Sequence, residues 1–93
     1  MSLRFEYDPI KAARKLSKHG ISFAEAETVF VDPLAREVPD LEHSFEEERL
    51  LLVGRSFRLR LLVVVFTERS DSIRIISARE ATRAERSHYE EGS

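Results

Sequence analysis

Residues 59–66 read Leu-Arg-Leu-Leu-Val-Val-Val-Phe, and this stretch decides the fold. Leu61 to Phe66 are apolar without interruption, so the stretch lacks the alternation of a strand that keeps one face in water. Continuous apolarity over this length predicts a central strand that is covered on both faces. We therefore expect a sheet with this strand in its middle.

The segments on either side of this strand also have the character of strands. The apolar run Leu50–Val53 precedes it, and Gly54–Arg58 is a connection of hairpin length. After it, Ser70–Asp71 marks a turn and Ile73–Ala78 predicts a further strand. With a short strand at Leu34–Val38, the sequence predicts an antiparallel sheet of about four strands.

The N-terminal third predicts an edge strand and two helices. Leu3–Tyr7 alternates apolar and polar residues, as a short edge strand does. Asp8–Pro9 is a helix start, and that helix should end at Gly20. Ser22–Glu25 has the spacing of a capping box and opens a second helix that Asp32–Pro33 stops. We expect the two helices to pack as a hairpin.

A third helix is expected at the C-terminus. Ser77–Glu80 again has capping-box spacing, and Gly92 can end the helix that follows. The predicted fold is therefore α+β, with two N-terminal helices, the antiparallel sheet and a C-terminal helix. Residues 1–93 should form a single domain, because a chain this short hardly carries two independent cores.

Composition excludes several classes of protein. The 93 residues include no cysteine, which excludes a disulfide scaffold, a thiol nucleophile and a thiolate zinc site. The longest apolar run is far shorter than the ~20 residues that span a bilayer, and the N-terminus does not resemble a signal peptide. We expect a soluble, cytoplasmic protein without a membrane association.

The formal net charge of −2 hides an uneven distribution. Residues 1–20 carry five basic and two acidic residues, and residues 55–86 carry eight basic and four acidic residues. Residues 37–48, expected as a loop or as the approach to a strand, carry six acidic residues and no basic one. Arginine outnumbers lysine by twelve to three, and arginine is preferred where phosphate or carboxylate is held in fixed geometry. The pattern predicts two opposed charged surfaces and an anionic partner for the basic one.

Arginines near the sheet and the last helix are the first candidates for chemistry. On a helix, Arg79, Arg83 and Arg86 would form one stripe, either a phosphate-binding face or a solvated face paired with neighbouring glutamates. Arg74 lies inside an apolar strand, where a charge needs an anion, a groove or an edge. Antiparallel pairing returns Arg79 to the end of the sheet where Arg60 begins. We therefore expect Arg60, Arg74 and Arg79 to form a cluster.

Proton transfer could come from a histidine or a glutamate. His19, next to Lys18, could be a general acid or base, or could simply complement the end of its helix. Glu48 is expected to point into the sheet and reach Arg60 or Arg74, either as a structural partner or as a base. His43, among six acidic residues, is expected to be solvated.

The sequence lacks motifs for nucleotide-dependent or metal-dependent reactions. It contains no glycine-rich phosphate loop, no HExxH, no Gly-x-Ser-x-Gly and no pair of histidines at ligand spacing. No cofactor or metal is therefore expected. Cleavage of RNA by its own 2′-hydroxyl needs only groups that move a proton and stabilise phosphorane charge, which arginine, lysine, histidine and glutamate can supply.

The sequence resembles the BrnT family of toxins along nearly its whole length. The resemblance is carried by Lys18-His19-Gly20, by the central strand ending in Thr67-Glu68-Arg69, and by Ile75-Ile76-Ser77-Ala78-Arg79, in this order. It departs from the family pattern at Leu59, where glycine is usual, and more mildly at Tyr7 and Lys15.

This resemblance implies a type II toxin with a RelE-like fold that cleaves RNA without a metal. It implies neutralisation by a ribbon-helix-helix antitoxin of the BrnA kind, in a heterotetramer that contacts operator DNA only through the antitoxin. The family's polar positions correspond to the candidate catalytic residues Lys18, His19, Glu48, Arg60, Arg74 and Arg79. Contacts to RNA are expected from Arg55, Arg58, Arg83 and Arg86. The alternatives are a non-catalytic module of the same fold that binds RNA or antitoxin, and a purely structural subunit.

Overall fold

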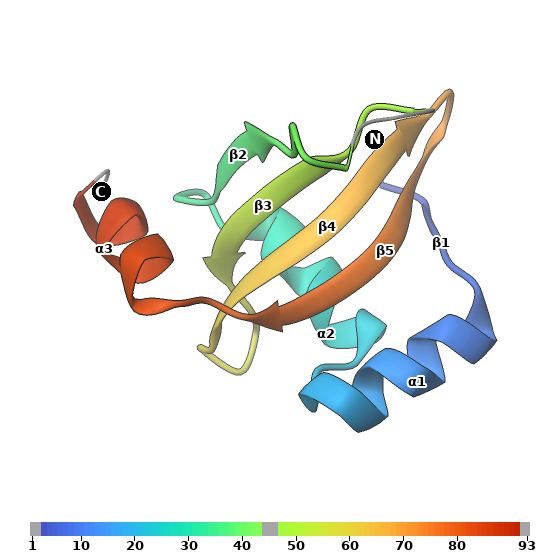
Figure 1. Ribbon diagram of the computed structural model, residues 1–93, viewed down its shortest axis with the longest axis horizontal. Helices are drawn as coiled ribbons and strands as arrows, with labels where there is room; N and C mark the ends of the chain where they lie inside the picture. Colours follow the sequence, from blue (N-terminus) through green and yellow to red (C-terminus); the bar gives the residue numbers. More distant parts are fainter. Residues whose placement is uncertain (1–2, 44–46, 92–93) are drawn as a thin grey trace.

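The computed structural model describes residues 3–43 and 47–91 of the chain. Its elements are β1 (Phe5–Glu6), α1 (Pro9–His19), α2 (Phe23–Thr28), a 3-10 turn η1 (Val29–Val31), β2 (Arg36–Pro39), β3 (Leu50–Arg55), β4 (Leu61–Arg69), β5 (Ser72–Glu80) and α3 (Arg83–Glu91). The strands form one sheet in the order β1-β5-β4-β3-β2 (Figure 1). Neighbouring strands from β2 to β5 are antiparallel, and the short β1 joins the edge parallel to β5. The α+β class and the four antiparallel strands are confirmed.

The first two helices begin where the sequence predicts, and α1 also ends there. α2 ends earlier than predicted, at Thr28, and the 3-10 turn η1 continues from it to Val31, before Asp32–Pro33. The Asp8 carboxylate accepts hydrogen bonds from the backbone N–H groups of Ile10 (2.9 Å) and Lys11 (3.3 Å), which caps α1. Gly20 ends this helix at φ 72°, in the left-handed region. Ser22 caps α2 by accepting a hydrogen bond of 3.0 Å from the N–H of Glu25.

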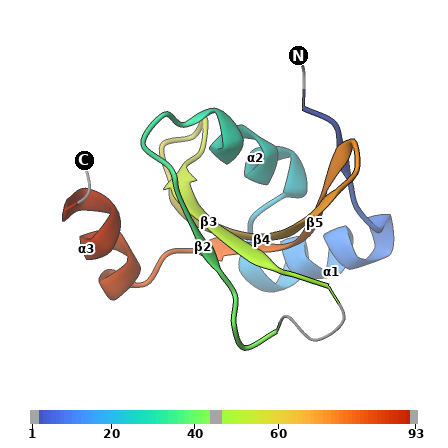
Figure 2. The ribbon, with the colours of Figure 1, turned by 90° about the horizontal axis from the view of Figure 1, so that it is seen from above.

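The predicted packing of the two helices as a hairpin is wrong. α1 packs along β5, whereas α2 lies across one face of the sheet (Figure 2). α1 buries none of its residues fully, while α2 buries Phe23 and Ala26 in the core. Ile10 and Leu16 of α1 are 66% and 46% exposed, so this helix adds little to the core.

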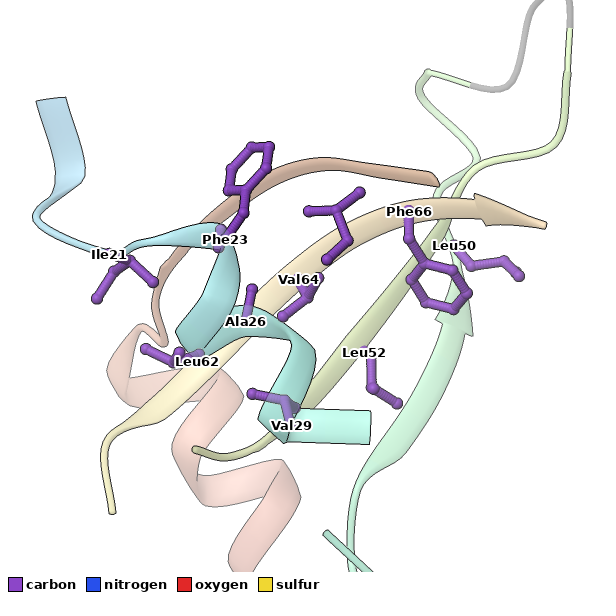
Figure 3. Packing of buried hydrophobic residues seen from close by; sticks show 11 residues of the cluster. Ile21, Phe23, Ala26, Val29, Leu50, Leu52, Leu62, Val64 and Phe66 are labelled. Atoms are coloured by element: carbon purple, nitrogen blue, oxygen red, sulfur yellow. The ribbon is translucent and has the colours of Figure 1, made fainter. Parts of the chain in front are cut away.

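The main core lies between α2 and the face of the sheet that α2 covers (Figure 3). The residues of this cluster that Figure 3 labels are Ile21, Phe23, Ala26, Val29, Leu50, Leu52, Leu62, Val64 and Phe66. Val63 and Val64 are adjacent in β4 and point to opposite faces, yet both are 0% exposed. The central strand is therefore buried on both sides at Val63 and Val64, as its continuous apolarity predicts, whereas Val65 is half-buried.

The C-terminal helix begins later than predicted. Ser77–Glu80, expected to open it, is paired with β4 as the last part of β5. A different capping box starts α3: the Thr82 N–H donates to Glu85 Oε1 at 2.8 Å, and the Glu85 N–H donates to Thr82 Oγ1 at 3.2 Å. Arg79 thus lies in a strand, and the predicted helical stripe of Arg79, Arg83 and Arg86 is wrong.

The connection between β3 and β4 also differs from the prediction. It covers residues 56–60 rather than 54–58, because Arg55 pairs with Leu61 across the two strands. The Leu59 N–H donates to the Ser56 carbonyl (2.8 Å) and the Ser56 N–H donates to the Arg60 carbonyl (2.9 Å). Within the described part of the chain, Leu59 is the one residue other than glycine with positive φ, at 64°. Leucine thus occupies a left-handed position in a tight hairpin, which explains why glycine suits it better.

No helix in the described residues is both long enough and apolar enough to cross a membrane.

Candidate functional site

The face of the sheet opposite α2 carries the candidate site. We call it the open face; strand pairing places Leu51, Val53, Val63, Val65, Arg74 and Arg79 on it. A cleft of about 360 Å³ is lined by Lys15, Asp40, Glu42, His43, Arg49, Leu51, Val65, Ile76, Ser77 and Arg79. A second cleft of about 150 Å³ shares Arg49 and Ile76 with it and adds Asp8, Lys11, Glu47, Arg74 and Ile75. Together the two clefts form a polar surface between α1 and the β2–β3 connection.

A β-bulge brings Arg74 and Arg79 to the same face. These residues are five apart, so in a regular strand they would point to opposite faces. Ile75 pairs with Phe66 and Ser77 pairs with Val65, which leaves Ile76 as an extra residue. Arg74 therefore lies opposite Thr67, and Arg79 lies opposite Val63, four residues along β4. Both arginines point to the open face.

Two lysines of α1 border the clefts. Lys11 and Lys15 are four residues apart and hence on one side of the helix, and Lys18 continues the same stripe. Within residues 3–43 and 47–91, neither Lys11 nor Lys15 has an ion pair through its side chain. Both ammonium groups can therefore bind an anion without breaking an existing pair.

Arg79 is held in place by the last helix. Its Nη1 donates to Glu85 Oε1 (2.8 Å) and its Nη2 donates to Glu85 Oε2 (2.9 Å), while Nη1 also lies 3.2 Å from the Glu80 carbonyl oxygen. The hydrogen bonds from Arg79 lower the pKa of Glu85 from 4.5 to about 2. This bidentate contact fixes the guanidinium plane at the edge of the cleft.

Arg60 lies elsewhere, so the predicted cluster of Arg60, Arg74 and Arg79 does not form. Its Nε donates to Glu25 Oε2 at 2.9 Å, and its Nη2 donates to Glu25 Oε1 and to the Gly20 carbonyl. Glu25, only 2% exposed, also accepts a hydrogen bond of 2.6 Å from Ser56 Oγ. The hydrogen bond from Arg60 is the main cause that lowers the pKa of Glu25. Arg60 joins the start of β4 to α2, on the other side of the sheet.

The other candidate catalytic residues are dispersed. Lys18 is exposed and His19 is half-buried at the end of α1. Glu48 is exposed, and its backbone carbonyl accepts a hydrogen bond from Thr67 Oγ1 (2.8 Å). The expectation that Glu48 reaches Arg60 or Arg74 is wrong.

The four arginines expected to contact RNA lie outside the clefts. Arg55 donates its N–H to Asp32 (2.8 Å), and its guanidinium lies 5.8 Å from the centre of the Tyr89 ring, as in a cation–π contact. Arg58 is exposed in the β3–β4 connection, and Arg83 and Arg86 are exposed on α3. Arg55 thus helps to anchor α3.

Sequence reasoning missed several residues that line the clefts. Lys11 and Lys15 could have been found from their helical spacing next to Lys18. Asp40, His43 and Arg49 carried no such signal, since only the pairing of β2 with β3 places them beside the sheet. In the described part of the chain, no group of three or more His, Cys, Asp or Glu residues could hold a metal ion.

Comparison with known proteins agrees with this architecture. Residues 7–85 match the family described as "Ribonuclease toxin, BrnT, of type II toxin-antitoxin system". The chain belongs to the BrnT family. It is also similar to the crystal structure of the Brucella abortus ribonuclease toxin BrnT, with a TM-score of 0.67 and 24% sequence identity over 88% of this chain and 100% of that one. No curated protein sequence matches the chain. Membership of a type II toxin-antitoxin family implies an antitoxin as partner.

Proposed function

We propose that this BrnT-family chain is an endoribonuclease that cleaves RNA on the open face of its sheet, without a metal, through the RNA's own 2′-hydroxyl. One observation carries the proposal: five cationic side chains line the two connected clefts of that face. They are Lys11, Lys15, Arg49, Arg74 and Arg79. Such a row suits a phosphodiester backbone, whose charges repeat along the strand.

Each group would have a distinct part in the reaction. Lys11 and Lys15, which form no ion pair with any other described residue, would bind the backbone phosphates on either side of the scissile bond. Arg74 and Arg79 would stabilise the charge that develops on the phosphorane. Lys18 extends the binding surface. The sequence assigns proton transfer to His19 or Glu48, but neither residue lines either cleft. Arg60 would act by positioning the start of β4 through Glu25.

The antitoxin is proposed to be a ribbon-helix-helix protein of the BrnA kind. By resemblance to the family, toxin and antitoxin would form a heterotetramer in the cytoplasm that contacts operator DNA through the antitoxin. A competing function is that of a non-catalytic module that binds RNA, which would also use these cations. The two functions differ in whether RNA is cut.

The test uses purified toxin, free of antitoxin, incubated with total RNA across a range of pH. Wild-type protein should cleave RNA in the presence of a chelator, and Arg79→Ala should lower the rate on the order of 10²–10³-fold, as expected for loss of one charge-stabilising donor. Arg4→Ala is the control, since Arg4 pairs with Asp71 on an exposed edge. Binding that weakens steeply with salt, with RNA left intact at every pH, would favour the module instead.

A further inference from the structure

A carboxylate and an imidazole from the β2–β3 connection meet in the larger cleft. The Asp40 N–H donates to the Arg49 carbonyl at 2.8 Å, so the β2–β3 ladder extends one residue beyond Pro39 and fixes Asp40 to the sheet. Its side chain is only 12% exposed. His43 Nδ1 lies 3.1 Å from Asp40 Oδ1 and 3.0 Å from Oδ2. The His43 side chain is itself 58% exposed, as expected for a solvated residue, and its ring is joined through Asp40 to the end of the β2–β3 ladder.

This contact decides which ring nitrogen is free. An ionised carboxylate can only accept hydrogen bonds, so Nδ1 of His43 must carry the proton and donate it to Asp40. In the neutral ring, Nε2 then has an unshared electron pair. A histidine with this tautomer, held by a carboxylate, has the form of a general base.

Cations lie in the same cleft as His43, together with the carboxylates of Asp40 and Glu42. The cleft that His43 lines is also lined by Lys15 from α1, Arg49 before β3 and Arg79 from β5. A phosphodiester bound by these cations would lie next to the imidazole. Among the three histidines of the chain, His43 is the one that lines this cleft.

We propose that His43 is the proton-transfer residue for RNA cleavage on the open face, and that Asp40 is its positioning residue. This inference rests on the proposed function and adds a residue to its site. His43 Nε2 takes the proton of the 2′-hydroxyl while O2′ forms a bond to phosphorus and the bond from phosphorus to O5′ breaks. O5′ takes up a proton from solvent, and the imidazolium returns one. The products are a 2′,3′-cyclic phosphate and a 5′-hydroxyl, with no other reactant consumed.

The pH dependence should reflect this role. Only the neutral imidazole can accept the proton, so the rate should fall on the acidic side as His43 becomes protonated. The charged groups that share the cleft with His43 are Asp40 and Glu42 from its own connection, Lys15, Arg49 and Arg79.

The experiment compares three variants of the full chain under single-turnover conditions, from pH 5 to pH 9. His43→Gln should lower the cleavage rate about 10²–10⁴-fold, the range for loss of a general base, and should remove the acidic limb of the profile. Asp40→Asn should lower the rate and shift that limb, because an amide can hold the ring in the wrong tautomer. His88→Gln is the matched control, since His88 is exposed on α3 and does not line this cleft.

Two further measurements separate catalysis from folding and binding. Affinity for 2′-O-methyl RNA, which cannot be cleaved, should stay within about threefold in all variants, and their thermal unfolding should match that of wild type. The inference is overturned if wild type cleaves RNA and His43→Gln does so within about threefold with the same pH profile. If wild type cleaves no RNA, the proposed function itself fails, and the role of His43 fails with it.

Discussion

In the hairpin between β3 and β4, we expect glycine to stabilise the protein more than alanine does, which is the reverse of the usual order of stability. At an ordinary exposed position, alanine is more stable than glycine by about 0.5–1 kcal/mol, because glycine loses more backbone entropy on folding. Leu59 has φ 64° and is 75% exposed, so its side chain contributes little packing while its backbone is strained. The left-handed region costs a residue with a Cβ about 1–2 kcal/mol, and glycine escapes that cost. Leu59→Gly should therefore be more stable than Leu59→Ala by about 0.5–1 kcal/mol.

Urea unfolding followed by circular dichroism measures this difference at constant m-value. In a domain of this size it corresponds to a higher Tm for Leu59→Gly of about 2–8 °C. Leu41 is the control, because it is 84% exposed without positive φ, and there alanine should be the more stable substitution. If Leu59→Ala equals or exceeds Leu59→Gly in stability, the left-handed conformation is not strained and the reasoning is refuted.

Three other substitutions test contacts of the fold and the site. Gly54→Ala should destabilise the protein by about 1–3 kcal/mol in urea unfolding, since its Cβ would lie 2.9 Å from side-chain atoms of both Val29 and Ala35; wild-type stability would contradict this packing. Arg60→Ala should lower the Tm, because Glu25 would keep its buried charge without its main donor, and a variant that loses activity at unchanged Tm would instead support direct catalysis. The lowered pKa of Glu85 should make stability fall as the pH drops from about 4.5 towards 2, and Glu85→Gln should remove that part of the pH dependence of the Tm.

The sequence was most informative where local and global signals agree. The central strand could be predicted because no solvent-exposed strand would be apolar from Leu61 to Phe66, and α1 because its caps lie at both ends. The C-terminal helix was misplaced because the sequence holds two capping boxes in succession. The first of these, Ser77–Glu80, lies in a strand because Ala78 pairs with Val64 of β4. This contact is long-range, so the local sequence does not indicate it.

The site was harder to predict because side-chain direction depends on irregular pairing. Nothing in the sequence marks Ile76 as an extra residue, yet without it Arg74 and Arg79 would lie on opposite faces. The sequence groups Arg60 with them because antiparallel pairing brings Arg79 to the end of the sheet where Arg60 begins. Its actual partner, Glu25, is distant in sequence and belongs to a helix that covers the other face.

The acidic residues of the clefts bear on what the open face does. The charge pattern predicts two opposed surfaces, but Asp40, Glu42 and Glu47 of the acidic stretch lie in the same clefts as the cations. Carboxylates weaken the attraction of a surface for phosphate, so a face that only bound RNA would be better without them. Asp40 instead holds an imidazole, and a further carboxylate, Glu85, fixes the Arg79 guanidinium. The acidic residues of this surface therefore weaken its affinity for RNA, but they hold the imidazole and the guanidinium in fixed orientations. Fixed orientation serves catalysis rather than binding, so the mixed surface favours cleavage as the function of this face.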